Sequence, residues 1–312
     1  MIAIKYKTDK KALKKAYFNA FGNKILSNIE KRWADVKKDY PFLDKFKCTI
    51  YDLLLGDFRM LIRVYLNYIS EYKKWSTGKT EANIVEYKSK IMNVFNYKGY
   101  HDRIATFFMD QANEFDIYTC HYCEISYINA YVHENRKKNH FDLDHVLDKG
   151  NCPLLGLSLM NFVPSCQCCN EKIKRQETLG GNDPSKMYKL SPTSPEYDFD
   201  GQVKIGVVIC KLPLSPGFMK NKDCYSMNFL TIDNDYSDIV KKLHLRERYE
   251  YHKGEALRLL DLAESYTEHT IPKIAKLLGY SEEQVREDIF GSNFVNDQCR
   301  CFKKLRKDIL NP

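Results

Sequence analysis

The sequence predicts an α+β protein that is mainly helical, with a small metal-stabilised core near its middle and a short β element after that core. Apolar residues recur at helical spacing through the first hundred residues. Two Cys-x-x-Cys pairs lie between 115 and 180, and β-branched apolar runs follow at 203–210 and 227–232. We therefore predict a helical region at 1–114, the metal-stabilised core at 115–180, and an extension of short strands followed by helices at 181–312.

Long helical patterns fill the first region. Apolar and basic residues mix at helical spacing from Lys10 to Lys37, from Phe46 to Trp75 and from Ala82 to Phe115. Gly56 lies inside the second pattern and is expected to kink or divide it. Helical spacing returns from Asp235 onward and continues to the basic C-terminal stretch. These apolar stripes are interpreted as core.

Charge and cysteine content indicate which partners and which cellular compartment to expect. Lys and Arg number 49 against 41 Asp and Glu, a net charge of +8 that is compatible with a nucleic-acid partner. The N-terminal sequence MIAIKYKTDKKALKK lacks the apolar stretch of a secretory signal, and no apolar run approaches the roughly 18 to 20 residues that span a bilayer. We therefore expect a cytoplasmic protein whose eleven cysteines are reduced and which has no membrane partner.

The two cysteine pairs predict one structural zinc site. Cys120 and Cys123 form the first pair, and Cys166 and Cys169 form the second. Four thiolates at such spacings can close a tetrahedral zinc site, and an inserted hairpin would explain the long gap between the pairs. Cys168 is an alternative third thiol in the second pair, although the x-x spacing favours Cys166 and Cys169. A redox role for Cys-x-x-Cys is the competing interpretation, but the βαβ context of such motifs is missing.

Between the cysteine pairs lie residues suited to phosphodiester hydrolysis. The segment Phe141–His145 alternates apolar and polar residues and is expected to form a strand, in which Asp142 and Asp144 share one face. Hydrolysis needs a general base for water and a divalent ion that stabilises the charge developing on the phosphate. His145 has a suitable unperturbed pKa for the base. Asp144 and Asn170 offer hard oxygen ligands for Mg²⁺ or Mn²⁺.

This arrangement resembles the HNH endonuclease family, which has a ββα-metal fold with a structural zinc. The resemblance implies that His145 is the general base and that Asp144 is a ligand of the catalytic metal. It implies also that Asn161 holds the histidine-bearing loop in place and that Asn170, directly after the final cysteine, is the second metal ligand. The chain would then be an H-N-N variant. The resemblance covers about 60 residues and places the ββα unit within 115–180.

Basic residues around this core are expected to contact phosphates. They are Lys149, Lys172, Lys174 and Arg175. The sequence departs from the family at a neighbouring position. A lysine often found three residues after the Cys-Asn dipeptide is replaced by Ile173, which weakens the assignment of one phosphate contact.

The function predicted from these residues is metal-dependent hydrolysis of DNA. The sequence is similar also to HNH proteins of bacterial anti-phage defence systems, which implies an ATPase partner of the kind found in Septu-type pairs. RNA is the second possible substrate, because both polymers contain the same phosphodiester. The alternative function is a non-catalytic, zinc-stabilised module that binds nucleic acid or protein.

Overall fold

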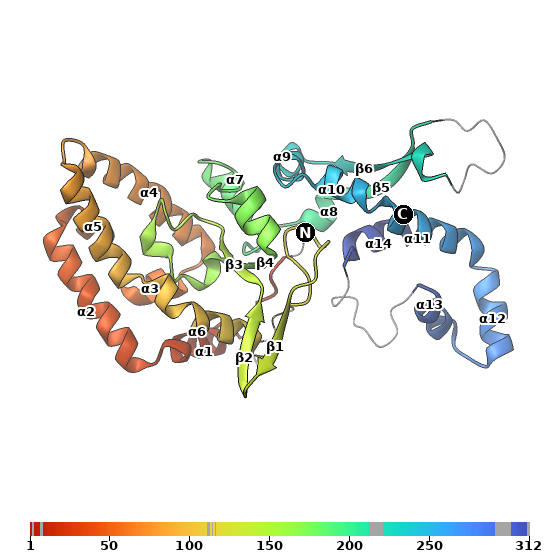
Figure 1. Ribbon diagram of the computed structural model, residues 1–312, viewed down its shortest axis with the longest axis horizontal. Helices are drawn as coiled ribbons and strands as arrows, with labels where there is room; N and C mark the ends of the chain where they lie inside the picture. Colours follow the sequence, from red (N-terminus) through yellow and green to blue (C-terminus); the bar gives the residue numbers. More distant parts are fainter. Residues whose placement is uncertain are drawn as a thin grey trace. The chain divides into compact units, whose positions relative to one another are not determined.

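The structure is a computed structural model that describes residues 1, 3–6, 9–110, 113, 115, 117–211, 221–290 and 301–310 (Figure 1). The chain divides into two compact units, and each is described by itself. The helical unit comprises Ala3–Ile117 and Ile128–Tyr197, and the C-terminal unit comprises Met1–Ile2, Tyr118–Tyr127 and Asp198–Pro312. The predicted segment 115–180 contributes to both units, so the units do not follow the three predicted segments.

Helices of the N-terminal region make up most of the helical unit. They are α1 (Lys10–Phe21), α2 (Asn23–Asp39), α3 (Ile50–Leu55), α4 (Phe58–Ser76), α5 (Glu81–Val94) and α6 (Tyr97–Met109), with a 3-10 turn at Pro41–Lys45. The predicted division at Gly56 is confirmed, because α3 ends directly before it. Gly22 adds a break inside the first helical pattern. Its φ of 78° is a left-handed value that glycine adopts without strain.

The strands of the described residues form three two-stranded antiparallel sheets, in agreement with a mainly helical α+β protein. The pairs are β1 (Asn129–His133) with β2 (Arg136–His140), β3 (Asp142–His145) with β4 (Phe162–Ser165), and β5 (Val203–Ile209) with β6 (Tyr225–Thr231). The two predicted β runs at 203–210 and 227–232 therefore do form strands. The hairpin expected in the gap between the cysteine pairs is β1–β2, and strands β3 and β4 lie in the same gap.

Aromatic side chains dominate the core of the helical unit. Tyr87 on α5 is fully buried, and its hydroxyl lies 2.7 Å from the hydroxyl of Tyr68 on α4. The rings of Tyr40 and Trp75 pack against the Tyr87 ring, each with a centroid separation of 4.8 Å. Such pairs stabilise a core beyond the burial of their area alone. The N-terminal helices thus pack into one core with the β3–β4 sheet beside them. Helix α7 (Pro184–Lys189) packs on α4.

The C-terminal unit combines the β5–β6 sheet with the remaining helices. These are α8 (Phe199–Gln202), α9 (Asn234–Lys242), α10 (Leu245–Tyr251), α11 (Lys253–Ser265), α12 (Thr270–Leu278), α13 (Glu282–Phe290) and α14 (Lys303–Leu310). Asp308 joins α14 to the sheet, because its carboxylate accepts from the Ile205 backbone N–H at 2.8 Å and pairs with Lys304. No helix within the described ranges is long and apolar enough to cross a bilayer.

Candidate active site and metal centre

A cavity of about 1340 Å³ in the helical unit brings five of the predicted site residues together. Asp144, His145, Lys149, Asn170 and Arg175 line it, although they come from β3, the loop after β3, and the turn after β4. Helices α4, α5 and α6 supply the other side of the cavity. Its volume exceeds what a single phosphate group fills, so it has room for a nucleotide-sized portion of a substrate.

His145 ends strand β3 and is buried, with 5% of its surface exposed. Its Nε2 lies 3.0 Å from the Gly156 carbonyl oxygen. A carbonyl can only accept, so Nε2 carries the proton and Nδ1 keeps its lone pair. Burial lowers the pKa of His145 well below its usual value, and the positive charge of Lys149 lowers it further. The imidazole is therefore neutral at pH 7 and able to accept a proton at Nδ1.

The Asn161 side chain holds the loop that follows His145 through several hydrogen bonds. The Asn161 side chain is fully buried, accepts from the Leu147 N–H at 2.7 Å and donates to the Leu147 carbonyl at 3.0 Å. A third bond runs from its Nδ2 to the Leu155 carbonyl at 3.1 Å. Tyr17 of α1 then donates to the Leu157 carbonyl at 2.7 Å. These contacts hold Gly156, which sets the orientation of the histidine ring.

Asp144 forms a buried ion pair with Lys174 that the sequence did not predict. The Lys174 Nζ lies 2.9 Å from Asp144 Oδ2 and 3.2 Å from Oδ1, and it donates to the His145 carbonyl at 3.0 Å. The Lys174 side chain has no exposed surface. Its ammonium cannot meet a phosphate from this position, so the prediction that Lys174 contacts nucleic acid is wrong. Lys174 instead braces the Asp144–His145 dipeptide.

A π-helical turn, Cys168–Lys174, brings Lys174 to this position. The Arg175 N–H donates to the Asn170 carbonyl at 2.8 Å, five residues back, whereas an α-helix closes at four. The wider turn accommodates one additional residue and directs Lys174 inward.

Asn170 and Asp142 form a second polar pair at the cavity wall. The Asn170 Nδ2 donates to Asp142 Oδ2 at 3.0 Å, which leaves the Asn170 carbonyl oxygen available to accept. Burial raises the pKa of Asp142, and the hydrogen bond from Asn170 opposes that rise. The oxygen atoms of Asp142, Asp144 and Asn170 are hard donors, the chemistry that suits Mg²⁺ or Mn²⁺.

The other predicted phosphate contacts have different surroundings. Lys149 places its Nζ 3.4 Å from His145 Nδ1 and 4.7 Å from the centroid of the Tyr97 ring. Desolvation lowers the pKa of its ammonium. Arg175 is exposed and lines the cavity, whereas Lys172 is exposed and is not among the lining residues. Lys149 and Arg175 are thus the predicted cations that border the cavity.

Two cavity residues on α6 were missed by sequence reasoning. The Tyr97 ring packs edge-on against the His145 ring, with centroids 4.6 Å apart, and against the His101 ring at 5.5 Å. His101 also lowers the pKa of both Asp142 and His145 through its charge. The one available signal was their i, i+4 spacing, which places both side chains on one helix face.

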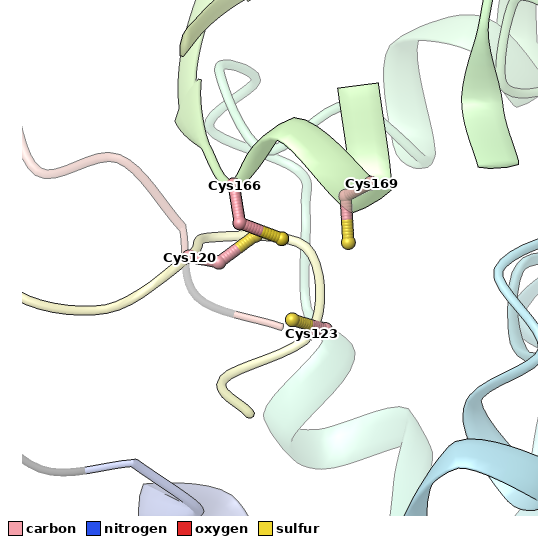
Figure 2. A group of neighbouring side chains, drawn as sticks. All are labelled: Cys120, Cys123, Cys166 and Cys169. Carbon is pink, nitrogen blue, oxygen red and sulfur yellow. The ribbon is translucent and has the colours of Figure 1, made fainter. Parts of the chain in front are cut away.

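The four predicted cysteine ligands meet in one cluster. The Sγ atoms of Cys120, Cys123, Cys166 and Cys169 all lie within 4.8 Å of one another and point toward a common centre (Figure 2). Tetrahedral zinc with Zn–S bonds of about 2.3 Å requires sulfurs about 3.8 Å apart, which this cluster can reach. Cys168 is exposed, as expected if it is not a ligand. The group can hold a metal ion.

Local hydrogen bonds shape the first cysteine turn. The Glu124 N–H donates to the Cys120 carbonyl at 2.9 Å, and the Ile125 N–H donates to the Cys123 sulfur at 3.4 Å. Glu124 has a φ of 56°, which closes the turn tightly. The Tyr249 hydroxyl donates to the Cys123 carbonyl at 2.9 Å and fixes the turn within the C-terminal unit. An N–H directed at a sulfur favours the thiolate form that binds metals.

Comparison with known proteins gives no relative. No family model matches the chain, and no curated protein or solved structure matches it at a significant level.

Proposed function

We propose that the protein is a metal-dependent endonuclease of the HNH type that hydrolyses phosphodiester bonds in DNA. The observation that carries the proposal is the meeting of a neutral, buried His145 with Asp144 and Asn170 at one cavity. Strands β3 and β4 and the helical turn after them also follow the ββα order that the sequence resemblance implies. Asn161 holds the histidine-bearing loop, the role that the resemblance implies for it.

The geometry of His145 defines its part in the reaction. Its Nδ1 takes a proton from a water molecule in the cavity as the water oxygen attacks phosphorus. The bond from phosphorus to the leaving oxygen then breaks, and that oxygen takes a proton from solvent. The Gly156 carbonyl stabilises the imidazolium that forms, because Nε2–H already donates to it. Lys149, beside Nδ1, is placed to contact a phosphate oxygen.

The oxygen donors at the cavity would hold the catalytic cation. Asp144 and Asn170 would bind Mg²⁺ or Mn²⁺, and the ion would supply stabilisation of negative charge on the phosphate and the leaving oxygen. Lys174 neutralises part of the charge on Asp144. We therefore expect the cation to bind weakly to the protein alone and more tightly when a substrate phosphate adds its own negative charge.

The four-cysteine cluster would hold one structural zinc ion. Closed sites of four thiolates bind zinc without an open position, so this metal would support the fold and take no part in hydrolysis. The turn that contains Cys120 and Cys123 belongs to no described helix or strand, so zinc binding would contribute directly to its folding free energy.

Plasmid cleavage with Mg²⁺ or Mn²⁺ tests the proposal. His145→Ala is expected to abolish cleavage while the chain stays folded and its zinc content remains that of the wild type. His269→Ala is the matched control. His269 is an exposed histidine of the C-terminal unit, so this variant should cleave DNA normally. If the chain is instead a non-catalytic binding module, His145→Ala keeps full function whereas Cys120→Ser loses it through unfolding. Full cleavage by His145→Ala would refute the nuclease proposal.

The substrate and the partner need separate measurements. Matched DNA and RNA substrates of one sequence test the choice of polymer, and we expect DNA to be cleaved faster. The ATPase partner proposed from the sequence resemblance is tested by affinity purification from the native host. Full activity of the isolated chain, with nothing co-purifying, would argue against that partner.

A further inference from the structure

The β1–β2 hairpin is a two-stranded ribbon that leads directly into strand β3. Its two-residue turn, Glu134 and Asn135, has positive φ at both positions, 47° and 60°, which is the geometry of a type I′ turn. This turn matches the right-handed twist of the paired strands. The hairpin is also fixed at its side, because β2 packs against α6 and the Lys137 Nζ approaches the Met109 carbonyl at 3.4 Å.

The ribbon presents basic and aromatic side chains to solvent. All five residues of β1 are exposed, among them Tyr131 with 55% and Val132 with 67% of its surface exposed. Their cross-strand partners are Lys138 and Lys137, which are exposed as well. Neither lysine forms an ion pair with a described residue. Exposed apolar and cationic groups in register on a narrow ribbon are suited to an anionic polymer with an apolar interior.

We infer that this hairpin is a DNA-binding ribbon that enters the major groove of duplex DNA beside the cavity. The major groove is about 12 Å wide and admits a two-stranded ribbon. Five residues per strand span about 17 Å, or half of a helical turn of about 34 Å. The lysines then neutralise backbone phosphates, and Tyr131 contacts base edges or the sugar. In Figure 1 the tip of the hairpin points away from β3 and β4.

The position of the ribbon relates it to the cavity. Strand β2 ends at His140, and β3 begins at Asp142, which lines the cavity. One residue therefore separates the ribbon from the catalytic strand, so the ribbon contacts fall within about five base pairs of the scissile phosphate. This placement rests on the proposed function, since it takes the bound duplex to be the substrate. We propose B-form DNA as the partner, and not an RNA duplex, because the major groove of A-form RNA is too deep and narrow for side chains to read.

Binding in the absence of catalysis tests the inference. The full chain with zinc and the His145→Ala change, without added divalent ions, is titrated onto a labelled duplex of about 20 base pairs at several salt concentrations. Fluorescence anisotropy gives the Kd at each salt concentration. Lys137→Glu/Lys138→Glu is expected to raise the Kd about tenfold or more and to lower the slope of log Kd against log salt by about two, because each neutralised phosphate contributes about 0.9.

Two further variants distinguish binding by the hairpin from a general effect of net charge. Lys10→Glu/Lys11→Glu makes the same change in net charge at two exposed lysines of the same unit, and it should alter the Kd less than about threefold with an unchanged slope. Tyr131→Ser should raise the Kd several-fold without changing the slope, because it removes contact area and no charge.

Specific results would overturn the inference. They are an equal effect of the two charge-reversal pairs, an unchanged slope for the hairpin pair, equal affinity for a matched RNA duplex, or no duplex binding at all. Each leaves the nuclease proposal to be decided separately by plasmid cleavage. If Lys137→Glu/Lys138→Glu lowers the thermal stability, Lys137→Gln/Lys138→Gln replaces it, with an expected slope change in the same direction.

Discussion

Replacing Lys174 by methionine is expected to destabilise the helical unit by about 3–5 kcal/mol. The Lys174 ammonium contacts both carboxylate oxygens of Asp144 and the His145 carbonyl, and the two side chains have 0% and 3% of their surface exposed. Methionine keeps most of the volume but leaves a carboxylate buried without its cation. At about 1.4 kcal/mol per factor of ten, the folding equilibrium constant should fall roughly 100- to 4000-fold.

Guanidinium chloride unfolding with zinc present measures this loss through tryptophan fluorescence. Both tryptophans, Trp33 and Trp75, lie in the helical unit together with the ion pair. Asp144→Leu alone should cost a similar amount, because it leaves a buried ammonium. The double variant Lys174→Met/Asp144→Leu removes both charges and should recover most of the stability. Additive losses, or a loss below about 1 kcal/mol for Lys174→Met, would show that the pair behaves as a solvated one and refute the argument from burial.

The remaining predictions concern the proposed general base His145, its support by Asn161, and the cysteine cluster. Because burial holds the pKa of His145 below 6.5 in the folded chain, the unfolded chain takes up a proton first as the pH falls through 6.5. The free energy of unfolding should therefore fall as the pH is lowered from 7.5 to 5.5, as measured by denaturant titration without added divalent ions. His145→Gln should lose the part of this pH dependence that comes from the histidine. An identical pH dependence in wild type and variant would contradict the prediction. Asn161→Ala should lower the free energy of unfolding by about 3 kcal/mol in the same assay, because it leaves buried backbone groups of Leu147 unpaired. A change of less than about 0.5 kcal/mol, roughly that of a surface substitution, would contradict this prediction. Elemental analysis should find about one zinc per chain in wild type and Cys168→Ser and much less in Cys169→Ser; equal zinc in both variants would exclude Cys169 as a ligand.

Short-range patterns in the sequence account for the parts that were predicted correctly. The cysteine spacing identified the cluster because a Cys-x-x-Cys turn closes through local hydrogen bonds, such as the one from Glu124 N–H to the Cys120 carbonyl. The β-branched runs identified β5 and β6 because both pack one face on a core. Gly56 marked a helix boundary because glycine lowers helix stability at any position inside a helix.

The sequence did not show what depends on contacts between distant segments. Strand alternation placed Asp144 and His145 on opposite faces, yet both line one cavity, because His145 is the last residue of β3. Lys174 was assigned to the surface because its inward direction depends on a π-helical turn, which has no local sequence signal. Tyr97 and His101 lie in a region that was interpreted as core alone, and their role at the cavity depends on how α6 packs beside β3.

The helices of the first region are therefore part of the site and not a separate support for it. Tyr17 on α1 bonds to the Leu157 carbonyl, and the preceding Gly156 carbonyl fixes the proton of the His145 ring. Tyr97 on α6 packs on that same ring and excludes solvent from it. Desolvation is the largest cause of the lowered pKa of His145, so these helices keep the proposed base neutral. The Asp144–His145 dipeptide supplies groups of the proposed reaction, and the helical region sets the protonation state of His145.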